Sequence, residues 1–141
     1  MIEDFILWIF LGINTITDMR NRSIYVAITL LFGIVEIAMF VCGEKTEVFS
    51  LAGGMMAGVC LMMFSALTRG AVGFGDGLVV SVAGIRLGGG KTMLVLMGGF
   101  LLVIVTGIVG ICVGKMNRKT EIPFVPFFTL SYALFYIGGL L

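Results

Sequence analysis

Residues 48–68 read VFSLAGGMMAGVCLMMFSALT, an apolar run without a charged side chain. At 1.5 Å per residue, a helix over this run would cross the roughly 30 Å hydrocarbon core of a bilayer. The whole 141-residue chain is 60% hydrophobic and only 12% charged, which leaves too few polar side chains to cover a soluble domain. The sequence therefore predicts an all-α membrane protein.

Six apolar runs predict about six transmembrane helices in a single polytopic domain over residues 1–141. The runs are 2–17, 24–42, 48–68, 77–87, 92–113 and 124–141. The first run contains Glu3 and Asp4 and lacks the basic leader of a removable signal peptide, so we expect a permanent helix. The fourth run is too short to span alone, and the glycines at 88–90 separate it from the fifth. Glycine pairs at G-x-x-x-G spacing, such as Gly54 and Gly58, predict close helix packing.

The distribution of Lys and Arg between the loops predicts the orientation. With the N-terminus outside, the inner loops carry most of the basic side chains. The inner set is Arg20, Arg22, Arg69, Lys115, Arg118 and Lys119, and the outer set is Lys45 and Lys91. This orientation places Asp18 and Asp76 at cytoplasmic helix ends.

The composition excludes several chemistries. The chain has no histidine, which removes H-E-x-x-H zinc sites and the Ser-His pairs of most hydroxyl nucleophiles. Cys42, Cys60 and Cys112 are far apart in apolar surroundings, and we expect them to be buried small hydrophobes. A net charge of +1 without a basic run argues against nucleic acid as a partner. We expect no metal and no cofactor, which leaves carboxylates, lysines and hydroxyls for chemistry.

One carboxylate stands between glycines, in GFGDG at residues 73–77. Glycine at alternate positions predicts irregular backbone, which at membrane depth is tolerated where it lines a cavity or is buried in protein. An ionisable side chain in such a place is a functional hypothesis by default, so Asp76 is a candidate site residue. The same glycines would allow an extended peptide to approach the backbone closely.

Asp18 ends the first run and, taken alone, is typical of a solvated helix end. If the first and fourth helices touch, however, Asp18 and Asp76 can share one proton, because like charges a few ångströms apart cannot both ionise. The ionised carboxylate would activate water and the protonated one would polarise a peptide carbonyl. The two residues therefore predict peptide hydrolysis without histidine or metal.

Three features together resemble the bacterial type IV prepilin peptidases and archaeal preflagellin peptidases, a family of G-x-G-D intramembrane aspartyl proteases. They are the Asp-x-Arg-x-x-x-Ile stretch at 18–24, the G-x-G-D at 73–76, and Ile-Pro-Phe-Val-Pro-Phe at 122–127. Two positions differ from the usual family pattern. Gly77-Leu78-Val79 follows the motif, where a hydrophobic residue and then a lysine are usual, and Ile24-Tyr25-Val26 replaces Ile-Pro-Asn.

The resemblance implies cleavage of a short basic leader from prepilin-like proteins at the cytoplasmic face, in the cytoplasmic (inner) membrane of a prokaryote, with Asp18 and Asp76 catalytic. It also implies a peptidase without methyltransferase activity, similar to the short forms that serve Flp or Tad-type pili. The substrate or active-site loop residues that it implies are Gly73, Phe74, Gly75, Gly77, Pro123, Phe124, Pro126 and Phe127.

Two further charges lie deep in the predicted helices. Glu36 and Arg86 fall about 18 and 15 Å from the cytoplasmic helix ends, and an isolated charge there costs several kcal/mol. We therefore predict a structural Glu36–Arg86 pair. Two other functions stay open: a small transporter or channel that uses Asp76 and Glu36, and a catalytically inert relative that assists pilus assembly.

Overall fold

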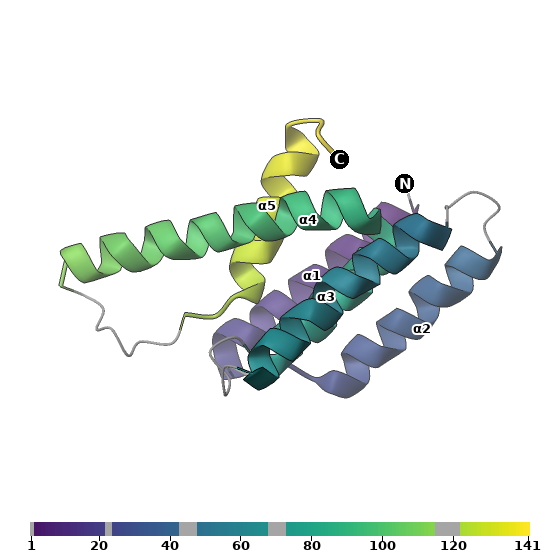
Figure 1. Ribbon diagram of the computed structural model, residues 1–141, viewed down its shortest axis with the longest axis horizontal. Helices are drawn as coiled ribbons and strands as arrows, with labels where there is room; N and C mark the ends of the chain where they lie inside the picture. The colour runs from purple at the N-terminus through teal and green to yellow at the C-terminus, as the bar shows by residue number, and fades with distance from the viewer. Residues whose placement is uncertain (1, 22–23, 43–47, 68–72, 115–121) are drawn as a thin grey trace.

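The computed structural model describes residues 2–21, 24–42, 48–67, 73–114 and 122–141. These residues form five helices and no strand, which confirms the all-α prediction for the described part of the chain. The helices are α1 (Ile2–Asn21), α2 (Val26–Cys42), α3 (Val48–Leu67), α4 (Phe74–Cys112) and α5 (Val125–Ile137) (Figure 1). Of the basic residues behind the orientation, Arg22, Lys45, Arg69, Lys115, Arg118 and Lys119 lie outside the described residues.

Within the described residues, two helices, α3 and α4, are long and apolar enough to cross a membrane. Two others, α2 and α5, are apolar but shorter than a full span. The described helices thus support membrane association, and the number of spans and the orientation stay predictions.

The predicted fourth and fifth runs are joined in one helix, α4, which bends at Gly88. Gly88 has φ 74° and ψ 168°, a backbone conformation that is essentially restricted to glycine. A Cβ at this position would also collide with the Ser50 hydroxyl on α3. The expected interruption by glycines 88–90 is therefore a kink at one residue, and the flanking Gly89 and Gly90 are helical. Figure 1 shows the later part of α4 running across and beyond the other helices, with α5 crossing it.

Close backbone contact joins α3 to the first part of α4. A Cβ on Gly54 would collide with the backbone of Gly84, and a Cβ on Gly84 would collide with that of Gly54. One turn further along α3, a Cβ on Gly58 would collide with Ser81 and with the Gly77 carbonyl. The G-x-x-x-G prediction is confirmed for Gly54 and Gly58, since only glycine leaves room for two helices at this separation.

The core lies where α1, the first part of α4 and α5 meet. Buried residues recur at helical spacing along α1, at Leu7, Leu11, Asn14 and Asp18. They pack with valines at the start of α4 and with aromatic side chains of α5, namely Val79, Val80, Phe128 and Tyr132. The buried stripe of α1 thus changes from apolar to polar toward its C-terminal end, where the candidate site begins.

The prediction that the cysteines are buried is wrong for two of the three. Cys60 and Cys112 are exposed. Cys60 lies on α3 beside the buried stripe of Gly54, Gly58, Leu61 and Ser65 rather than in it, which leaves its side chain exposed. The Cys42 side chain lies outside the described residues.

Candidate functional site

Asp18 and Asp76 lie at the same end of the fold. Asp18 is in the last turn of α1, and Asp76 is in the first turn of α4. Both are buried, with 6% and 8% of their surface exposed, and they are close enough for the charge of Asp18 to act on Asp76. Two acidic side chains from distant parts of the sequence are thus brought together out of water.

The Asp18 carboxylate binds the start of α5. Its Oδ2 accepts a hydrogen bond from the backbone N–H of Val125, the first residue of α5, at 3.2 Å. The N–H groups of a first helical turn have no partner within the helix, and an anion there is favoured by the helix dipole. Pro126 follows in the same turn and has no N–H to donate. The proline-containing segment therefore lies beside Asp18, and from Val125 onward it is helical rather than the expected loop.

Asp76 caps its own helix. Gly73 is the N-cap residue of α4, with extended backbone at φ −61° and ψ 132°. The Asp76 N–H donates to the Gly73 carbonyl at 3.0 Å, and the Asp76 carboxylate accepts from the Gly73 N–H. The bond from the Gly73 N–H to the carboxylate is one half of a capping box, and glycine has no side chain to supply the other half. A Cβ on Gly73 would lie 3.0 Å from Asp76 Oδ2, so glycine leaves room for the carboxylate to fold back.

The prediction of irregular backbone through residues 73–77 is wrong beyond Gly73, because the chain is helical from Phe74 onward. Neighbouring elements explain the other two glycines. A Cβ on Gly75 would lie 2.8 Å from Cδ1 of Ile24, and one on Gly77 would lie 2.9 Å from the backbone N of Met62 on α3. Both glycines allow the start of α4 to fit against these neighbours, and their contact with a peptide stays a prediction.

The remaining predicted site residues divide by exposure. Phe74, next to Asp76 along the helix, is 55% exposed. Phe124 is buried against Phe100 of α4, with ring centroids 4.9 Å apart. The half-buried residues are Pro123, Pro126 and Phe127. Phe74 and these three retain surface for a bound peptide, as do the exposed Gly73 and the half-buried Gly75.

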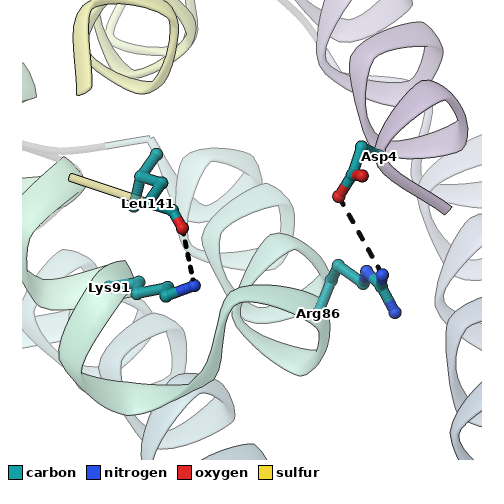
Figure 2. A network of polar contacts seen from close by, with 4 residues as sticks. All are labelled: Asp4, Arg86, Lys91 and Leu141. Carbon is teal, nitrogen blue, oxygen red and sulfur yellow. Dashed lines mark hydrogen bonds and ion pairs between the residues drawn. The ribbon is translucent and has the colours of Figure 1, made fainter. Parts of the chain in front are cut away.

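The start of α1 and the adjacent part of α4 before the kink carry opposite charges (Figure 2). Arg86 Nη2 of α4 lies 3.9 Å from Asp4 Oδ1 of α1, and beyond the kink Lys91 Nζ donates to the Leu141 backbone oxygen at 2.9 Å. Glu36, the predicted partner of Arg86, is buried, and that pairing stays a prediction. Asp4 was not predicted as a partner of Arg86. It could have been, because α1 and α4 run antiparallel with Asp18 and Asp76 at the same level, and this alignment places Asp4 near the depth of Arg86.

Polar side chains of α1 near Asp18 were also missed. Asn14 Oδ1 accepts from the Thr29 hydroxyl of α2 at 3.2 Å. Thr15 Oγ1 and Thr129 Oγ1 of α5 lie 2.8 Å apart. The available signal was spacing, because Asn14 lies one helical turn before Asp18 on the same face of an otherwise apolar run.

Among the described residues, no group of three or more His, Cys, Asp or Glu side chains could hold a metal ion. The chain matches no protein-family model, no curated protein and no solved structure. The residues of the site themselves therefore carry any functional inference.

Proposed function

We propose that this protein is a membrane aspartyl endopeptidase in which Asp18 and Asp76 form the catalytic pair. The observation that carries the proposal is the burial of both carboxylates where the end of α1 meets the start of α4, close enough for one charge to act on the other. Burying like charges together costs stability, so such a pair is more readily explained by chemistry than by folding. The spanning lengths of α3 and α4 support a location in a membrane.

The pair shares one proton, so that one carboxyl group is ionised while the other is protonated, and the reaction uses both forms. The ionised carboxylate removes a proton from water while the water oxygen bonds to the peptide carbonyl carbon, and the protonated carboxyl donates to the carbonyl oxygen. When the tetrahedral intermediate collapses, the C–N bond breaks and the amine leaves with a proton. The net reaction is addition of one water and requires no cofactor. Cleavage should show a bell-shaped pH dependence, because one group must be ionised and the other protonated.

The substrates of this proposal are prepilin-like proteins, cut at a short basic leader on the cytoplasmic side of a prokaryotic inner membrane. Support comes from the order of the three sequence features and from two placements in the fold. The G-x-G-D motif lies next to the end of α1, and the proline-containing segment is hydrogen-bonded to Asp18. The exposed Phe74 ring flanks this position and is suited to contact an apolar part of the substrate.

The test is a cleavage assay in membranes that co-express the protein with pilin-like proteins of the same genome. We expect Asp18→Asn and Asp76→Asn each to abolish the shortened product at unchanged protein level. Asp4→Asn is the matched control, because it removes a carboxylate from the same helix at the other end of the fold. Cleavage that persists without either member of the pair would exclude this peptidase mechanism.

Transport is the second candidate, favoured by Glu36, a third carboxylate that is only 3% exposed within α2. It predicts ion or proton flux through liposomes containing the purified protein. That flux would depend on Asp76 and Glu36, tolerate Asp18→Asn and be accompanied by no peptide product. Absence of both flux and cleavage would favour the inert assembly relative.

A further inference from the structure

A hydroxyl pair joins α1 to α5 next to Asp18. Thr15 Oγ1 and Thr129 Oγ1 lie 2.8 Å apart, and either can donate the hydrogen bond. Thr15 is about one turn before Asp18 on α1, and Thr129 is about one turn after Val125 on α5. The hydroxyl pair and the Asp18–Val125 hydrogen bond therefore lie about one turn, roughly 5 Å, apart along the same helix interface.

Two contacts at this spacing restrict the rotation and sliding of α5 more than one contact can. The Val125 N–H donates to Asp18 at 3.2 Å, and rotation or sliding of α5 would lengthen and bend this hydrogen bond. Hydrogen bonds weaken steeply when their angle is lost. A second contact one turn away opposes both movements. Apolar packing also restricts the rotation of α5, and the two hydrogen bonds add directional restraints at this point of the interface.

Other hydroxyls nearby bind elsewhere. Ser131 of α5 donates to the Val95 carbonyl of α4 at 2.9 Å, so it ties α5 to a different helix. Thr17 of α1 donates to the Ile13 carbonyl within its own helix at 2.9 Å. These two residues separate the effect of the α1–α5 contact from loss of a hydroxyl on either helix.

We infer that Thr15 and Thr129 are positioning residues that hold the Val125 N–H on the Asp18 carboxylate. The inference rests on the proposed peptidase function, for which it identifies what keeps Asp18 oriented toward Asp76. The threonines act through Asp18 and take no part in proton transfer.

The test combines hydrogen exchange with kinetics on the full chain in detergent. Thr15→Val and Thr129→Val remove the hydroxyl at nearly constant volume, and Thr15→Ser retains it. We expect each valine variant to accelerate exchange of the Val125 amide by about threefold, the typical effect of a hydrogen bond between membrane helices. We expect kcat for leader cleavage to fall by a similar factor at unchanged KM. The Thr15→Ser variant should keep the Val125 exchange rate and kcat at their wild-type values. The double valine variant should change these two quantities no more than either single valine variant does.

Unchanged Val125 exchange in both valine variants would overturn the inference. So would equal acceleration by Thr17→Val or Ser131→Ala, because general loosening of the helices would then explain the result. The exchange measurement needs no substrate. Asp18→Ala is its positive control, because loss of the carboxylate should accelerate exchange of the Val125 amide if that amide reports this contact. Failure of the peptidase proposal is seen separately, as cleavage that survives Asp18→Asn.

Discussion

The two ends of the α1–α4 pair use charge in opposite ways. At one end Asp18 and Asp76 bury like charges together, and at the other Asp4 of α1 lies against Arg86 of α4. The second arrangement neutralises charge near Tyr132, whose ring lies 4.9 Å from that of Trp8. Opposite charges at one end are explained by structure alone, whereas like charges at the other have an energetic cost. The comparison therefore assigns a structural role to Asp4 and Arg86 and leaves Asp18 and Asp76 as the candidates for catalysis.

The largest expected effect comes from the like-charged end. Asp18→Asn or Asp76→Asn should lower cleavage at least ~1,000-fold, since members of a catalytic unit each carry most of its effect. Thermal unfolding in detergent should be unchanged or shifted to higher temperature, because a buried repulsion is removed. If the double variant is no less active than either single variant, the two aspartates act together as one catalytic unit. A large loss of stability in both single variants would instead assign a structural role to this end.

The helix crossing between the two ends should be the next most sensitive feature. Gly84→Ala places a methyl group against the Gly54 backbone and should cost about 1–3 kcal/mol or more, because backbone cannot move aside. Gly90→Ala is the matched control. Gly90 is helical, and apart from its own helix backbone no described atom lies within 4 Å of its Cβ position, so alanine there should stabilise by about 0.5–1 kcal/mol. Equal unfolding temperatures for the two variants would contradict the described crossing.

Glu36 tests whether the oppositely charged end extends into α2. If Glu36 pairs with Arg86, Glu36→Gln should destabilise by about 1–3 kcal/mol, because a charged partner loses its counter-charge. Adding Arg86→Met should restore most of the loss. Independent, additive effects in denaturation of the single and double variants would exclude the pair.

The smallest effect is expected at Asp4. Its side chain is 40% exposed and lies at 3.9 Å from Arg86, so solvent weakens the interaction. Asp4→Asn should change stability by less than about 1 kcal/mol and leave cleavage unchanged. A loss of cleavage comparable to that of Asp18→Asn would remove the contrast between the two ends.

The primary sequence alone determined the helical class and the candidate pair. Apolar runs predict helices residue by residue, and an aspartate at each of two helix ends can be recognised without knowing how the helices pack. The glycine run at 88–90 also predicted a break, which the structure places at Gly88. Local composition carries this information because helix formation in an apolar chain depends on near neighbours.

Only the tertiary structure decided how those elements meet. In the fold, Asp18 lies near Asp76 and accepts a hydrogen bond from the Val125 N–H. Ile24 contacts the position beside Gly75, and α3 contacts the position beside Gly77. The tertiary structure also placed Asp4 against Arg86, which the depth argument did not anticipate. These contacts join residues far apart in the sequence, and they depend on the rotation and crossing of whole helices. Such rotations follow from many weak packing contacts at once, so no short stretch of sequence specifies them.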